Sequence, residues 1–117
     1  MAKKRIPDDL GLLALSDIEN QEPMAVRYLL QLLETKHPGG TIELRVPPHG
    51  AVQLVGGLNH RRGTPPNVVE LDPKSFFELA MGTASFETLQ TAGRVLVSGA
   101  RANELKELFP LGGLKVS

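Results

Sequence analysis

The first clear pattern of hydrophobic and polar positions is a helical one. Pro23 stands where the first turn of a helix tolerates proline, and the run His37-Pro38-Gly39-Gly40 is typical of a helix end. Between them, four apolar residues occur at positions i, i+3, i+4 and i+7: Val26, Leu29, Leu30 and Leu33. This spacing predicts an amphipathic helix that buries one face.

After this helix, the pattern changes to alternation. Ile42, Leu44 and Val46 are apolar, whereas Glu43 and Arg45 between them are charged, which is typical of a half-buried strand. The same reasoning, with the flanking turn residues, predicts five strands: residues 41–46, 51–55, 58–62, 67–71 and 94–98. The short connections among the early strands favour antiparallel neighbours.

Helical patterns return in the second half. Asp72-Pro73 predicts the start of a helix that ends at Gly82, and Ser85 predicts the start of a shorter one that ends at Gly93. A last helix is expected over residues 100–109. The predicted fold is therefore α+β, with a five-stranded, mostly antiparallel sheet and helices covering one face. Residues 1–21 are expected to form an N-terminal tail or linker, and residues 22–117 the domain.

Composition narrows the class of protein. Among 117 residues, 13 are Lys or Arg and 13 are Asp or Glu, so the formal net charge is zero. That balance argues against a general nucleic-acid binder, which needs excess positive charge. There is no cysteine, which excludes disulfides and thiolate metal sites. With neither a secretory signal nor a long apolar stretch expected, the predicted location is cytoplasmic.

The most unusual segment runs from His60 to Glu70. It places two arginines, a glycine and a proline pair between predicted strands, and this favours a charged, rigid loop. Five of its residues are candidates for binding an anionic head group or a partner: His60, Arg61, Arg62, Thr64 and Asn67. Arginine suits bidentate binding of carboxylate or phosphate. The alternative is structural: one arginine pairs with Glu70 or Asp72, and Asn67 binds nearby backbone.

Several stretches carry a family resemblance. These are Asn67-Val-Val-Glu-Leu-Asp-Pro73, residues 76–82, residues 86–99 with their Gly-x-Val-x-Val-x-Gly-like end, residues 41–48, and the Gly-Thr-Pro-Pro-Asn-Val-Val run. Over residues 24–111 the chain resembles the sterol carrier protein family, and more narrowly its bacterial orthologues from actinobacteria. The resemblance implies an α+β domain with an apolar tunnel between sheet and helices, which in relatives holds fatty acyl chains, sterols or their coenzyme A esters.

The aromatic and aliphatic residues of the second half are the candidates for lining such a pocket. They are Phe76, Phe77, Leu79, Met81, Phe86, Leu89, Val95, Val97, Leu105 and Phe109. Ligand pockets are mostly apolar. Apolar residues at helical spacing also form ordinary cores, and this alternative stays open.

Three functions are compatible with these observations. The first is a non-enzymatic carrier of a hydrophobic lipid, fatty acyl or sterol-like ligand, without a cofactor. The second is an accessory module that binds a helical, metal-dependent thiol-transferase-like protein. The third, a free-standing enzyme, would depend on His60 as its base. A metal site would need His37, His49 and His60 to converge, so none is expected. Residues 58–62, as an edge strand, would offer a surface for a homodimer.

Overall fold

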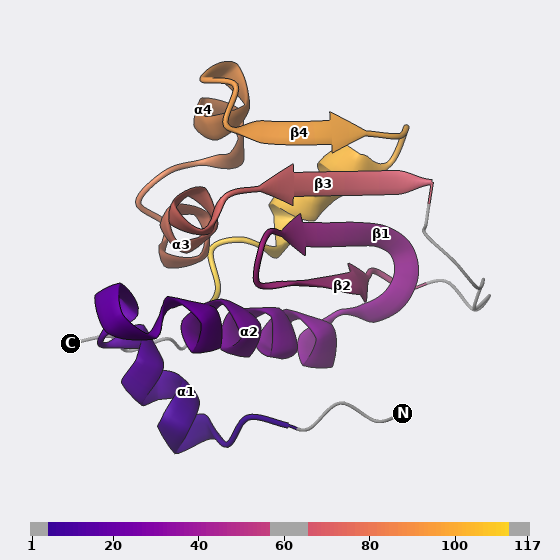
Figure 1. Ribbon diagram of the computed structural model, residues 1–117. Helices are drawn as coiled ribbons and strands as arrows, with labels where there is room; N and C mark the ends of the chain where they lie inside the picture. Colours follow the sequence, from indigo (N-terminus) through magenta and orange to yellow (C-terminus); the bar gives the residue numbers. More distant parts are fainter. Residues whose placement is uncertain (1–4, 57–65, 113–117) are drawn as a thin grey trace.

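The computed structural model describes residues 5–56 and 66–112. Its elements follow one another as helices, strands, helices, a strand and a final 3₁₀ helix (Figure 1). They are α1 (Asp8–Leu15), α2 (Ile18–Lys36), β1 (Pro38–Val46), β2 (Gly50–Leu54), β3 (Asn67–Leu71), α3 (Pro73–Met81), α4 (Phe86–Thr91), β4 (Val95–Ser98) and η1 (Ala102–Leu108). The predicted α+β class is confirmed.

The sheet has the strand order β2-β1-β3-β4 and is mixed. β1 pairs with β2, and β3 with β4, in antiparallel fashion, as expected. The central neighbours β1 and β3 are parallel, so the expectation of antiparallel pairing is wrong there. Pairing with β1 places Leu44 opposite Val69, both fully buried, which continues the apolar face across the sheet. The predicted strand 58–62 lies outside the described residues, which contain four strands.

Helices cover one face of this sheet. Alternation along the strands buries one row of side chains completely or nearly so: Ile42, Leu44, Val46, Val52, Leu54, Asn67, Val69, Leu71 and Val95. α2 packs against β1 and β2, while η1 packs against β3 and β4. The opposite face carries Glu43 and Arg45, which form an ion pair, and Leu96, which is 65% exposed. The expected one-sided coverage is therefore present in the described part of the chain.

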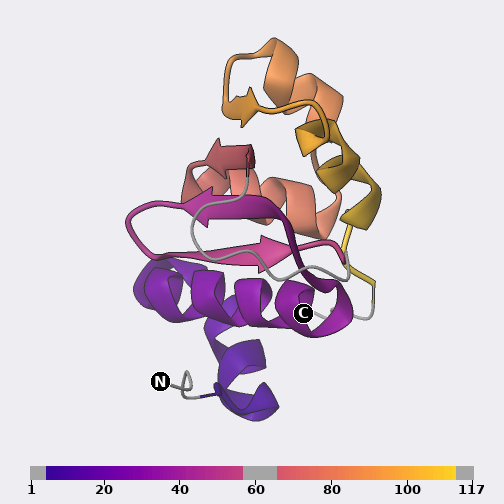
Figure 2. The ribbon, with the colours of Figure 1, turned by 90° about the vertical axis from the view of Figure 1, so that its right-hand side faces the viewer.

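The N-terminal region is more helical than the sequence predicted. The expected tail or linker, residues 1–21, contains α1 and the first turn of α2. α2 is interrupted at Gln21, whose backbone is not helical, and this break accommodates Pro23 just after it. α1 lies on the side of α2 that faces away from the sheet (Figures 1 and 2). A Cβ at Gly11 would lie 2.2 Å from the Tyr28 ring, so only glycine permits this contact.

The predicted helix ends in the second half are confirmed. Ser85 caps α4 by accepting a hydrogen bond from the Thr88 amide at 3.1 Å, and Gly82 ends α3 with a left-handed backbone, φ 82°. The last predicted helix is present but is a 3₁₀ helix. Its buried residues Ala102 and Leu105 are three positions apart, which is the repeat of a 3₁₀ helix.

Candidate functional site

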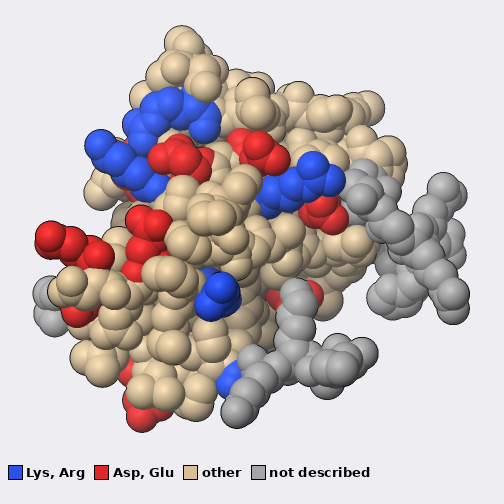
Figure 3. Space-filling model, in the orientation of Figure 1, with Lys and Arg blue, Asp and Glu red and all other residues tan. Residues whose placement is uncertain are grey.

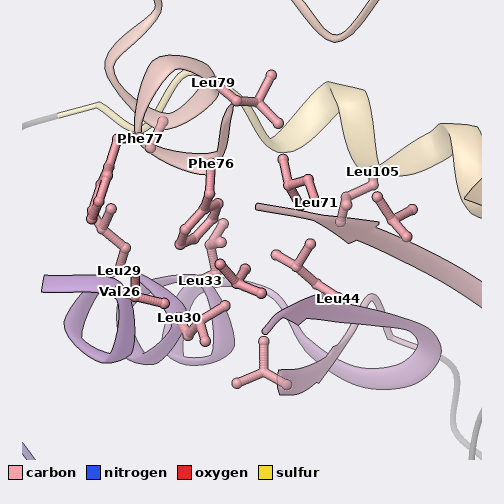
Figure 4. Packing of buried hydrophobic residues seen from close by; sticks show 14 of the residues in the cluster. Val26, Leu29, Leu30, Leu33, Leu44, Leu71, Phe76, Phe77, Leu79 and Leu105 are labelled. Atoms are coloured by element: carbon pink, nitrogen blue, oxygen red, sulfur yellow. The ribbon is translucent and has the colours of Figure 1, made fainter. Parts of the chain in front are cut away.

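The apolar residues predicted to line a pocket lie between the sheet and the helices and contact one another. Seven of them are buried: Phe76, Phe77, Leu79, Phe86, Leu89, Val95 and Leu105. Met81, Val97 and Phe109 are half-buried and pack against the same cluster. Figure 4 shows Phe76 and Phe77 extending from α3 toward Val26, Leu29 and Leu33 of α2. The structure thus brings the predicted set together as part of one hydrophobic core.

Phe76 is at the centre of this packing. Its side chain has no exposed surface, and its ring centroid lies 6.4 Å from those of both Phe77 and Phe109. The Phe109 ring meets it edge-on at 88°, which is a favourable aromatic arrangement. The space between α2, α3 and the sheet is occupied by side chains here. A ligand would have to displace them, and a pocket at this place stays a prediction.

Three of the predicted residues also border a surface cleft. Leu79, Phe86 and Phe109 lie at a hollow of about 390 Å³ between α3, α4 and η1. Glu87 and Lys106 stand on its wall, with Glu87 Oε2 and Lys106 Nζ 3.6 Å apart. Its lining is almost as polar as it is apolar, so the cleft offers little to a hydrophobic ligand.

The predicted head-group residues are almost all beyond what the structure describes. His60, Arg61, Arg62 and Thr64 lie outside the described residues, and Asn67 is inside them. The Asn67 side chain is buried; its Nδ2 donates to the Thr41 carbonyl at 2.9 Å, and its Oδ1 accepts from the Arg101 amide at 2.9 Å. Asn67 therefore binds backbone, as the structural alternative predicted, and a role toward a ligand stays a prediction.

A groove that the sequence did not reveal lies between the segment before α1, the side of α2 and the start of β2. Its volume is about 580 Å³, and its lining is mainly apolar. The apolar residues are Ile6, Met24, Leu30, Ala51 and Val52. The polar ones are Arg5, Arg27, Gln31, Glu34, Thr35 and His49. A concave surface of this size and composition is typical of a site for a small molecule.

Specific hydrogen bonds hold the walls of the groove. Gln31 fixes the N-terminal segment twice, because its Oε1 accepts from the Ile6 amide at 2.8 Å and its Nε2 donates to the Ile6 carbonyl at 2.9 Å. Across the groove, Arg27 Nε donates to the His49 carbonyl at 3.2 Å. The His49 ring contacts Glu22 Oε2 at 2.7 Å. Both walls are therefore anchored to α2.

Three further features of the described residues bear on function. No group of three His, Cys, Asp or Glu residues in segments 5–56 and 66–112 is arranged to hold a metal ion. On the face shown in Figure 3, acidic and basic side chains are interspersed. No described helix combines the length and the apolar character needed to cross a membrane.

Two side chains have shifted pKa values for identifiable reasons. Burial, followed by the hydrogen bond from its hydroxyl to Asp8, raises the pKa of Tyr28. For Asp72, burial is the largest single influence and acts to raise the pKa, but the Ser75 hydroxyl, backbone hydrogen bonds from Ser75 and Asp72 itself, and the charge of Arg94 together lower it. Tyr28 joins α1 to α2, and Asp72 precedes α3, so both groups belong to the scaffold.

Sequence reasoning missed the groove because its lining comes from three separate segments. Arg5 belongs to the expected tail, Arg27 to the polar stripe of the predicted helix, and His49 to a turn. One signal was available: Met24, Arg27, Gln31 and Glu34 recur every three or four residues, as a second stripe beside the buried one. Without the position of Ile6, that stripe is indistinguishable from an ordinary exposed helix face.

The comparisons with known proteins agree with the fold. No curated protein matches this sequence. One family does: the sequence profile described as the bacterial SCP ortholog, where SCP denotes sterol carrier protein, matches residues 19–111. That range extends from the start of α2 through η1 and includes the whole sheet. The chain therefore belongs to the bacterial orthologues of the sterol carrier protein family.

Proposed function

We propose that this protein is a non-enzymatic domain that binds and carries a hydrophobic ligand of the lipid, fatty acyl or sterol-like class. Membership of the sterol carrier protein family supports the class of ligand. The observation that carries the proposal is the groove of about 580 Å³, whose mainly apolar lining includes Leu30 and Val52. Burial of apolar ligand surface against these side chains is the driving force.

The groove is a better binding site than the pocket expected among the apolar residues of the second half. Phe76 and Leu105 are fully buried in contact with their neighbours, so a ligand there must first open the core. The groove is accessible as it stands, and it costs no rearrangement of the core. Pre-formed sites bind more tightly because the ordering cost is already met.

The test uses a neutral probe, 1-dodecanol, and one substitution that fills the groove. Ala51 is exposed on β2 and lines the groove, so Ala51→Trp places a large ring there without disturbing a buried residue. We expect dodecanol to bind the native protein saturably and the Ala51→Trp variant at least about tenfold more weakly. Titration calorimetry measures both affinities.

The matched control is Ala92→Trp. Ala92 is exposed at the end of α4 and lines none of the hollows described above, so its affinity for dodecanol should equal that of the native protein. Equal affinity of the native protein and both variants for dodecanol would contradict the groove as the binding site. Absence of dodecanol binding by the native protein, with no lipid in an organic extract of it, would contradict the carrier function.

A second candidate function is an accessory protein-interaction module, and α1 is the observation that favours it. This helix turns its small residues Gly11 and Ala14 toward α2, while Leu10, Leu12 and Leu13 are 46%, 41% and 57% exposed. Exposed apolar patches mark interaction sites. Under this function, the double substitution Leu10→Gln and Leu13→Gln would abolish binding to a purified helical thiol-transferase-like partner and leave dodecanol binding unchanged.

A further inference from the structure

Two guanidinium groups border the groove without a carboxylate partner. Arg5 and Arg27 both line it, and neither forms an ion pair with an acidic residue of segments 5–56 and 66–112. By contrast, Arg45, Arg94 and Arg101 are paired with Glu43, Glu78 and Glu104 respectively. The positive charge at the groove is thus available to an incoming anion.

Arg27 is held in a way that leaves its outer nitrogens for a ligand. Its Nε donates to the His49 carbonyl at 3.2 Å, and this bond fixes the guanidinium beside the start of β2. Nη1 and Nη2 make no hydrogen bond to the described parts of the protein. Two parallel N–H donors of one guanidinium match the two oxygens of a carboxylate or phosphate.

The acidic residues nearby do not cancel this charge. Glu22 does not line the groove, and its carboxylate contacts the His49 ring at 2.7 Å. Glu34 also lines the groove, but it is seven residues beyond Arg27 on α2, roughly 10 Å farther along the helix axis. A second hollow beyond it is bordered by Glu34 and Glu43. The groove therefore has a cationic part beside Arg27 and an acidic far end.

The lining between these ends is mainly apolar. Leu30 lies between Arg27 and Glu34 along α2, and Val52 lines the groove from β2. An apolar chain that starts at Arg27 can follow this lining, whereas an anionic head at the far end would meet the carboxylate of Glu34. The arrangement fits a ligand that is charged at one end only.

We infer that the groove selects single-chain amphiphiles with an anionic head, a carboxylate or phosphate, which Arg27 binds with help from Arg5. This inference rests on the proposed function and assigns the head group to residues of the N-terminal half. It separates recognition of the charge, at Arg27, from burial of the chain, along Leu30 and Val52.

The experiment compares probes that differ only in the head. Dodecanoate, dodecyl phosphate and 1-dodecanol share one chain, so the ratio of their dissociation constants isolates the contribution of the head. We expect the native protein to prefer an anionic probe over dodecanol by about tenfold. The better of the two anions identifies a carboxylate or a phosphate, and inorganic phosphate alone shows whether the chain is required.

The variants are Arg27→Gln, Arg27→Lys and Arg101→Gln. Arg27→Gln should abolish the preference for the anionic probes over dodecanol, whereas Arg27→Lys should keep part of this preference, because it keeps the charge. Arg101 is the control, since it pairs with Glu104 on η1 and should not affect the preference. The preference should also decrease as salt increases.

The outcomes separate this inference from the proposed function. Equal affinity of the native protein for dodecanoate, dodecyl phosphate and dodecanol overturns the inference and leaves the carrier function standing. A preference that survives Arg27→Gln together with Arg5→Gln also overturns it. Failure of all three probes to bind contradicts the carrier function itself.

Discussion

The protein has two mainly apolar regions that differ in how they are filled. Between α3, η1 and the strands β3 and β4, side chains meet with no exposed surface at Phe76 and Leu105. Beside β2, the groove has aliphatic walls of similar character and yet stays open. All four phenylalanines belong to the first region or its border, and none lines the groove. Bulky rings from neighbouring elements fill their space, whereas Ala51 and Val52 leave theirs empty.

This contrast teaches that hydrophobic composition alone does not locate a binding site. The residues with the strongest apolar pattern are those that the fold uses for its own stability. The open groove is lined by aliphatic side chains mixed with arginines and other polar residues, and hydrogen bonds to α2 hold its walls. Experiments that fill one region or empty the other can test this difference.

The largest effect is expected from emptying the filled region. Phe76→Ala removes a fully buried ring that contacts Phe77 and Phe109, so we expect the free energy of unfolding to decrease by about 3–5 kcal/mol. Denaturation in guanidinium chloride measures it. Leu96→Ala is the control; this side chain is 65% exposed and its loss should change stability by less than about 0.5 kcal/mol.

The same variant examines the comparison directly. If the ligand binds in the groove, the folded Phe76→Ala protein should bind dodecanol as tightly as the native protein does. A large change in dodecanol affinity in Phe76→Ala, with none in Ala51→Trp, would instead assign the binding site to the core between sheet and helices.

The next effect concerns the contact that supports one wall of the groove. A Cβ at Gly11 would lie 2.2–2.4 Å from three atoms of the Tyr28 ring, so Gly11→Ala must displace α1 or the ring. We expect a loss of about 1–3 kcal/mol in stability. Because Arg5 and Ile6 directly precede α1, dodecanol affinity should also decrease. Gly40→Ala is the control, since its Cβ would meet its nearest neighbour, Gln53 Oε1, at an ordinary 3.7 Å.

The smallest effect is a pH dependence at the edge of the filled region. The pKa of Asp72 is lowered from an ordinary value of 3.8, so its carboxylate stabilises the fold above that pH, and this contribution is lost as the pH falls through the folded-state pKa. Ser75→Ala removes a donor and should make the melting temperature less sensitive to acid as the pH is lowered through and below 3.8. An unchanged acid sensitivity would contradict this role, and Ser98→Ala, on the exposed part of β4, is the control.

The local elements could be predicted from the sequence because their signals are local. Ser85 and Gly82 stand at helix boundaries for reasons of backbone geometry, and Pro23 follows the interruption of α2 at Gln21. Alternation at Ile42 and Leu44 places β1 correctly. The parallel neighbour of β1 could not be predicted, because no short-range pattern specifies which strand occupies its free edge.

The candidate site could be predicted only in part, and for a related reason. The apolar residues proposed to line a pocket do contact one another, but periodicity does not distinguish a core from a cavity, and their role toward a ligand stays a prediction. The groove depends on two hydrogen bonds between Gln31 and Ile6, residues 25 positions apart. Gln31 and Arg27 therefore resembled solvated helix residues until the neighbouring segments were in place.

The two side-chain hydrogen bonds of Asn67 have a consequence for how the chain folds during its synthesis. Its side chain joins Thr41, 26 residues earlier, to Arg101, 34 residues later, and a Cβ at Gly99 would lie 2.4 Å from its oxygen. A ribosome releases the chain in order, so the hairpin of β1 and β2 can form first. The other edge of β1 stays unpaired until β3 has been synthesised, and Asn67 completes its hydrogen bonds only after residue 101. During that interval the nascent chain presents the unpaired edge of β1, at Leu44, to any chaperone that captures extended strands.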